Sequence, residues 1–286
     1  MRIKKDSFKI ICILPLLIFL FFFTLVPIIR LILLGFAPVG DCPGQWFTLA
    51  HYRQLFTHAT FKQAFFNTVV IALASLFIEL GLGLVLAMVL SRNYKYIRLL
   101  RPLFILPLAI PTAVAGVMMT YLFTTSGWIN RILSDAGLIN FPIHWMAGGW
   151  QSLLMVVLAD CWKVTPLVML ILLAGLQSID SSLYKAARID GAGSFYIFRR
   201  ITLPLLLPFI TAAVIIRGID AFRIFALPLI LMGQNLRVIG TYAYLEYMEF
   251  NNPYLSAASS TVLMAMIMMA VLIYIKVAGK RGLAVA

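Results

Sequence analysis

Six long apolar stretches constrain the fold of this 286-residue chain more than any other feature. A transmembrane helix needs roughly 20 mostly apolar residues to cross the hydrocarbon core of a bilayer. Hydrophobic residues make up 63% of the chain, more than a soluble core of this length could bury. We predict an all-α, polytopic membrane domain over residues 1–286, with its core at about 66–277. Its six spans are expected at residues 10–34, 66–90, 102–123, 153–176, 205–231 and 257–277.

The placement of Lys and Arg predicts which way the spans run. Six spans put both termini on one side, and basic residues resist translocation, so the basic side is the cytoplasmic one. Most of the 23 basic residues fall on the side of the termini. They are Arg2, Lys4, Lys5, Lys9, Arg92, Lys95, Arg98, Arg101, Lys185, Arg188, Arg199, Arg200, Lys276, Lys280 and Arg281. The net charge of +13 is therefore a topology signal, and no nucleic-acid partner is expected.

Cysteine and histidine positions argue against a metal site or a disulfide framework. Two cysteines fall within spans and one stands alone in an outer loop, while the three histidines are scattered and are expected at the surface. These residues are Cys12, Cys161, Cys42, His51, His58 and His144. The Gly-rich nucleotide-binding loop is missing as well. We expect no cofactor in this chain, so that any ATP and Mg²⁺ are bound by a partner subunit.

A helix-turn-helix is expected over residues 180–204, between two of the apolar stretches. Asp180 and the two serines after it offer N-cap oxygens to a short helix at 183–190. Gly191 supplies the left-handed residue that ends this helix. Ser194 is expected to cap a second helix, which Pro204 carries into the next span. On spacing alone, a docking surface and an ordinary solvated connector are equally good interpretations.

The residues of this segment resemble the coupling-loop signature of bacterial ABC-importer permeases. The matching positions are Ala186, Ala187, Asp190, Gly191, Ala192, Phe198, Ile201, Leu203 and Pro204. Lys185 stands where that signature normally has Glu, which is a reversal of charge. The resemblance implies that an ATP-binding subunit docks on Lys185, Ala186, Ala187, Asp190, Gly191 and Ala192.

The resemblance extends from the Pro15, Phe23 and Pro27 pattern to residues 254–257. It implies a non-catalytic, multi-pass inner-membrane permease subunit of a carbohydrate ABC importer, of the maltose or glycerol-phosphate first-permease type. The implied partners are membrane lipid, a second permease subunit, two ATP-binding subunits and an extracytoplasmic solute-binding protein. The implied substrate is an oligosaccharide, a glycoside or a glycosylated polyol, moved by alternating access.

Ionisable side chains lie within the predicted spans, where they are costly and face a bundle interior or water. They are Glu79, Asp160, Lys163, Arg217, Asp220 and Arg223. Helical spacing places Asp160 with Lys163, and Asp220 with both arginines, on shared faces. Two interpretations stay open: pairs that hold the bundle together, or a polar cavity for a hydroxyl-rich solute. Resemblance to maltose-type permeases implies substrate contacts at Asp160, Val164, Arg217, Asp220, Ala221 and Ile224, and leaves Glu79 unassigned.

Three prolines, Pro102, Pro107 and Pro111, predict a kinked third span whose freed carbonyls need neighbours. Residues 127–137 predict a short helix on the outer membrane surface.

An ion-coupled secondary transporter would also carry acidic residues at membrane depth, as proton or sodium sites. The chain shows no repeated half of the kind that many such transporters have. Whether uptake into vesicles depends on ATP or on an ion gradient separates the two classes.

Overall fold

The computed structural model describes residues 12–38, 47–91 and 95–282, and the elements in these ranges are all helices. Five are long and apolar enough to span a membrane: Cys12–Gly35, Ala59–Leu90, Gly149–Ser178, Ser194–Phe222 and Pro253–Val277. A sixth span is present if the bent pair Arg101–Ala109 and Thr112–Leu122 is counted as one. The predicted all-α membrane fold is confirmed. Arg2, Lys4, Lys5, Lys9, Cys42 and Arg92 lie outside the described residues.

The chain divides into two compact units. The smaller is Met1–Lys62 with Tyr242–Met264. It contains the π-helical segment η1 (Phe21–Leu25), α2 (Val26–Gly35) and α3 (Ala50–Thr57). His51 is buried there, stacked on Tyr254 with ring centroids 5.3 Å apart. The expectation of a surface histidine is wrong at His51, because the ring is covered by an aromatic partner and its Nε2 contacts the Ala37 carbonyl at 3.1 Å.

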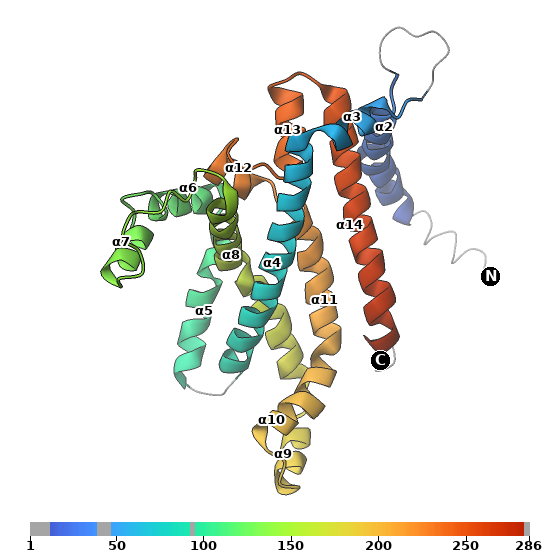
Figure 1. Ribbon diagram of the computed structural model, residues 1–286. Coiled ribbons are helices and arrows are strands. Elements are labelled where there is room, and N and C mark those ends of the chain that lie inside the picture. Colours follow the sequence, from blue (N-terminus) through green and yellow to red (C-terminus); the bar gives the residue numbers. More distant parts are fainter. Residues whose placement is uncertain (1–11, 39–46, 92–94, 283–286) are drawn as a thin grey trace, which may run out of the picture. The chain divides into compact units, whose positions relative to one another are not determined.

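The larger unit is Gln63–Thr241 with Ala265–Ala286, and it carries the residues of functional interest. Its helices follow one another in the order α4 to α12 (Figure 1), and the boundary with the smaller unit falls within α4, α13 and α14. Their bounds are α4 Ala59–Leu90, α5 Lys95–Ala109, α6 Thr112–Leu122, α7 Trp128–Asp135, α8 Gly149–Ser178, α9 Ser181–Ile189, α10 Ser194–Ile197, η2 Phe198–Thr202, α11 Leu203–Phe222, α12 Ala226–Met232, α13 Ile239–Met248 and α14 Pro253–Gly282.

Helix α8 passes through two apolar clusters, one toward each of its ends. Met155 and Val156 belong to the first cluster, and Val168 and Met169 to the second. Gly83 of α4 allows a close helix contact in the second cluster, since an added Cβ would lie 2.8 Å from Val168. Asp160 lies on α8 between Ala159 and Cys161 of the first cluster and is buried.

The third span is broken rather than merely kinked. Helices α5 and α6 meet at an angle of 100° across Ile110 and Pro111. Pro102 and Pro107 are tolerated inside α5, whereas Pro111 precedes α6 with an extended ψ of 141°. A proline disfavours the helical conformation of the residue before it, so the break falls at Ile110. The freed Ile110 carbonyl accepts a hydrogen bond from Lys163 Nζ at 3.0 Å, which confirms that a neighbouring helix satisfies it.

The fifth span is shorter than residues 205–231, and that prediction is wrong at its C-terminal end. Helix α11 stops at Phe222, and α12 begins at Ala226. Pro228 has no N–H and its ring would clash with the carbonyl four residues earlier in a continuous helix. Instead, α11 ends and a new helix begins, so that Pro228 lies in the first turn of α12, where no hydrogen bond is lost.

Reporter fusions test the predicted orientation. Helices α7 and α9 lie at opposite ends of α8 (Figure 1), so a fusion near Asp135 should report the outside and one after Arg188 the cytoplasm. Fusions near Gly44 and after Arg98 should report the outside and the cytoplasm respectively. Alkaline phosphatase and fluorescent-protein reporters read the two sides independently. An inverted pattern at any position would contradict the six-span topology.

Candidate functional site

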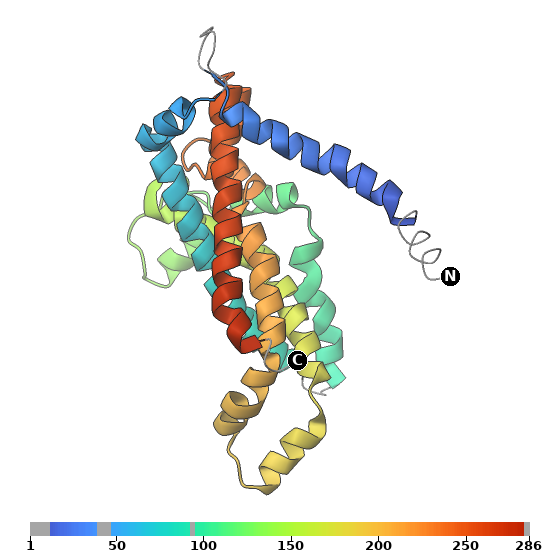
Figure 2. The same ribbon diagram turned by 90° about the vertical axis from the view of Figure 1, so that its right-hand side faces the viewer.

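The loop between α8 and α11 forms a capped helical hairpin at one end of the larger unit (Figure 2). Asp180 caps α9 by accepting the Ser182 backbone N–H at 2.9 Å, and this bond holds the pKa of Asp180 below its usual range. Helix α9 ends at Gly191, whose φ of +76° lies in the left-handed region. The Ala192 N–H donates to the Ala187 carbonyl at 2.9 Å, completing a Schellman cap. Asp180 as an N-cap and Gly191 as the stop are confirmed, but the helix begins at Ser181, two residues before the predicted start.

The second half of the hairpin differs from expectation at Ser194. Gly193 occupies the N-cap position and Ser194 is the first helical residue, so its hydroxyl caps nothing. From Ser194 the chain is helical to Phe222, with a π-helical segment over Phe198–Thr202. Pro204 follows this segment and cannot donate to the preceding turn, which favours a wider turn there. The coupling segment therefore continues directly into a membrane span.

Helix α9 presents two chemically different faces. Leu183, Ala186, Ala187 and Asp190 line an open groove of about 780 Å³, together with Gly191, Ala192, Gly193, Tyr196, Arg200 and Ile201. Five of the six residues predicted for ATPase docking therefore lie together. Lys185 does not join them. It lines a separate pocket with Ser181, Tyr184 and Arg188 on the other face.

Three charged side chains from three helices meet in the middle of the larger unit. Arg217 of α11 donates from Nε and Nη2 to the Glu79 carboxylate of α4, at 2.5 and 3.0 Å, and from Nη2 to Asp160 of α8. Their relative exposures are 2%, 0% and 6% respectively. Two carboxylates therefore share one guanidinium in a buried, hydrogen-bonded group. Glu79 was the member that sequence reasoning left unassigned.

The expected pairs within single helices form only once. Asp220 and Arg223 make a salt bridge of 2.8 Å, and their side chains stay 40% and 66% exposed. Arg217 turns to the neighbouring helices instead of to Asp220, and Lys163 bonds the Ile110 carbonyl instead of Asp160. For Arg217, partners on other helices are favoured because the guanidinium reaches two carboxylates there.

The six residues predicted to contact substrate are all in the larger unit, but they differ in access. Asp160, Arg217, Ala221 and Ile224 are buried. Val164 and Asp220 are only partly covered. The structure thus brings Asp160 and Arg217 into direct contact and leaves Asp220, with Arg223, as the accessible charged pair.

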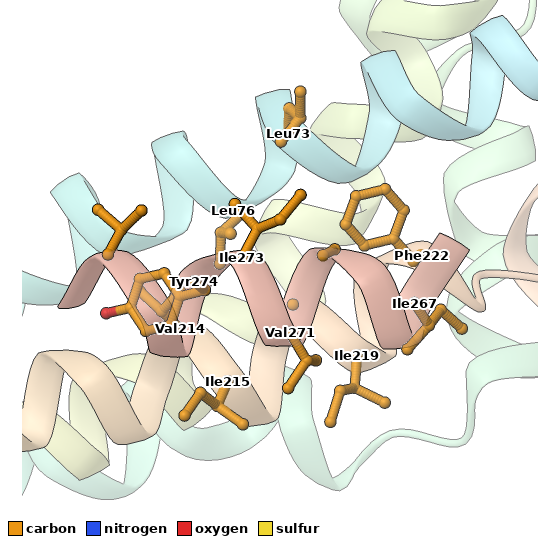
Figure 3. Close-up of a pocket in the computed structure, with 13 residues that line it drawn as sticks. Leu73, Leu76, Val214, Ile215, Ile219, Phe222, Ile267, Val271, Ile273 and Tyr274 are labelled. Carbon is orange, nitrogen blue, oxygen red and sulfur yellow. The ribbon is translucent and has the colours of Figure 1, made fainter. Parts of the chain in front are cut away.

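An apolar pocket lies between α4, α11 and α14 (Figure 3). Its volume is about 360 Å³, and it is lined by side chains such as Leu73, Ile219, Phe222 and Val271. Figure 3 shows Tyr274 as the one labelled side chain with a polar atom, and its hydroxyl lies 3.4 Å from that of Thr211. A pocket without free donors or acceptors cannot orient a sugar. Among the described residues, no group of three or more His, Cys, Asp or Glu could hold a metal ion.

Comparison with known proteins identifies the family. A family model described as "Binding-protein-dependent transport system inner membrane component" matches residues 79–278. The trehalose/maltose transport system permease protein MalF of Thermococcus litoralis is 31% identical over 284 residues, covering 97% of this chain and 95% of that protein. The arabinooligosaccharides transport system permease protein AraP of Bacillus subtilis is 31% identical over 270 residues, covering 91% and 85%.

A solved structure shows the same fold. The chain matches a bacterial ABC transporter involved in the import of the acidic polysaccharide alginate with a TM-score of 0.84 at 23% identity. The match covers 98% of this chain and 97% of that one. With the family model and two relatives above 30% identity, the assignment is secure: this chain belongs to the family of inner membrane components of binding-protein-dependent transport systems.

Proposed function

We propose that this permease subunit moves a carbohydrate, in the class of oligosaccharides, glycosides or glycosylated polyols. The observation that carries the proposal is the relation to the trehalose/maltose and arabinooligosaccharide permeases over nearly the whole chain. A permease for sulfoquinovosyl glycerol in Agrobacterium fabrum, 29% identical over 275 residues, extends the class to a glycosylated polyol.

The proposed assembly contains a second, related permease, two ATP-binding subunits and an external solute-binding protein. This chain is proposed to be non-catalytic and without a cofactor of its own, with ATP and Mg²⁺ held by the ATP-binding subunits. The groove formed by Ala186, Ala187 and Asp190 with the loop at Gly191 supports the docking role, since its alanines leave room for a close approach. Lys185 faces away from this groove, so we assign docking to the other five residues.

The accessible Asp220 and Arg223 are proposed to contact the sugar. An exposed ion pair contributes only about 0–1 kcal/mol to stability, so the Asp220 carboxylate and the Arg223 guanidinium are not needed to hold the fold and can bind a ligand. A carboxylate and a guanidinium together accept from and donate to neighbouring hydroxyls. Asp160 and Arg217 are buried and bonded to each other, and their proposed role is to fix α11 rather than to touch the substrate.

Neutralising Asp220 tests this site. Asp220→Asn keeps the shape and removes the charge, so the importer should assemble in normal amounts while the substrate concentration for half-maximal uptake rises about tenfold or more. A hydrogen bond to a charged group contributes roughly 1.5–3 kcal/mol, which accounts for a shift of that size. Uptake of labelled sugar into vesicles under ATP gives the measurement. Ser134→Ala on α7, away from the site, serves as the control, and an unchanged half-maximal concentration in Asp220→Asn would remove Asp220 from the site.

A further inference from the structure

The second face of α9 bounds a pocket of about 770 Å³ that the docking groove does not include. It lies between α9, α10, η2, Arg101 of α5 and the C-terminal ends of α4 and α8. Its chemistry is amphipathic, with apolar side chains including Met88, Leu176 and Phe198, and hydroxyls including those of Ser91 and Ser181. The pocket is therefore a separate feature of the coupling hairpin.

Three cations line this pocket: Arg101, Lys185 and Arg188. None of the described residues that line it carries a carboxylate, and none of the three cations takes part in a salt bridge with a described residue. Asp180, whose charged form Lys185 favours, is outside the lining and accepts the Ser182 N–H. Three positive charges around a pocket whose described lining has no carboxylate attract an anion.

Arg101 is held in place but keeps a donor unused. Its Nη2 donates to the Leu90 carbonyl at 2.9 Å, which fixes the guanidinium at the end of α4. Its Nε is buried and has no acceptor among the described atoms. A buried donor without an acceptor is costly, and phosphate oxygens fit a guanidinium fork closely. Lys185 and Arg188 add two further cations on one face of α9.

We propose that this pocket binds a phosphate-bearing anion, drawn either from the headgroup of an anionic phospholipid or from a soluble phosphate. The pocket lies at the end of the spans that the distribution of Lys and Arg assigns to the cytoplasm, where lipid phosphates are found. Basic pockets between transmembrane helices on this side bind anionic headgroups, and apolar side chains beside the cations suit the glycerol end of a lipid. The proposal also gives Lys185 a partner that a glutamate at this position would repel.

The test uses the full importer in nanodiscs of phosphatidylcholine, with and without phosphatidylglycerol. Native mass spectrometry measures how much phosphatidylglycerol is retained, and thermal shift measures binding of inorganic phosphate at constant ionic strength. Lys185→Gln and Arg188→Gln should each weaken binding about fivefold, in line with the contribution of one basic residue near an anionic surface. Lys185→Glu should weaken it further. Arg199→Gln removes one charge from the same hairpin outside the pocket, and should leave binding unchanged.

The outcomes show whether the pocket binds a phosphate group and whether that group belongs to a lipid or to a soluble molecule. Retention of phosphatidylglycerol without a response to inorganic phosphate assigns the site to the lipid. Stabilisation by inorganic phosphate, with displacement of phosphatidylglycerol, assigns it to a soluble phosphate. Equal losses in Arg199→Gln and the pocket variants would show attraction to general surface charge, and unaltered binding in Lys185→Gln and Arg188→Gln would leave the pocket without this ligand. Either of the last two results overturns the proposal.

Discussion

Gly191→Val is expected to leave the permease in the membrane but to lower transport by at least about tenfold. The φ of +76° at this residue costs a side-chain-bearing residue roughly 1–2 kcal/mol, and more for a β-branched one. Relief of that strain opens the Schellman cap and displaces the turn next to Ala186 and Ala187. Vesicle uptake and co-purification of the ATP-binding subunit measure the loss.

Two matched variants separate backbone strain from bulk. Gly193→Ala places a methyl group in open space two residues away, where φ is −70°, and should transport normally. Gly191→Asn should be intermediate, because Asn tolerates the left-handed region better than Val does. Normal coupling in Gly191→Val would contradict the role of this turn in docking.

Arg217→Leu is expected to have the largest effect on stability. The substitution leaves the Glu79 and Asp160 carboxylates buried without a partner, which costs about 3–5 kcal/mol. Such a loss is a large part of the stability of a typical domain, so little protein should accumulate and its melting temperature in detergent should fall sharply. Fluorescence-detected size-exclusion chromatography after heating provides the measurement.

The same group predicts non-additive behaviour among its members. Glu79→Gln and Asp160→Asn each leave Arg217 with one carboxylate, so each should be mild, whereas the double variant strands the arginine and should be severe. Adding Arg217→Leu to the double variant should restore part of the stability, because no unpaired charge remains. Arg223→Leu removes an arginine from the exposed pair on the same helix, and should change melting little. Strictly additive losses would mean that the three side chains do not act as a unit.

The coupling hairpin could be predicted from sequence because its determinants are local. An N-cap at Asp180 and a glycine at position 191 act within a few residues of the helix they delimit. The breaks near Pro111 and Pro228 also have local causes. The prolines of the third span predicted a kink there but not a full break, and the unbroken hydropathy of the fifth span hid the break near Pro228. Hydropathy measures the length of an apolar stretch and does not register a lost hydrogen bond.

The buried ion group could not be predicted in detail because its partners are far apart in sequence. Glu79 and Arg217 are separated by 138 positions, and Asp160 and Arg217 by 57. Spacing along one helix favoured Arg217 with Asp220, which is a nearer partner in the chain but is not the one that the helix packing brings within reach. The only sequence signal for Glu79 was its cost at membrane depth.

The bond between Arg217 and Asp160 also has a consequence for how a movement of the coupling hairpin is transmitted to the membrane spans. Helix α8 runs from Asp160 to Ser178 at the hairpin, and the helical stretch from Ser194 leads to Arg217, so each arm reaches roughly 25 Å or more at 1.5 Å per residue. The two arms are joined at one end by the hairpin and at the other by the Arg217 to Asp160 bond. A closed frame of this kind resists shear between its sides. We therefore expect a displacement of the hairpin to move the two helical segments together, with the ion group as the point about which they tilt.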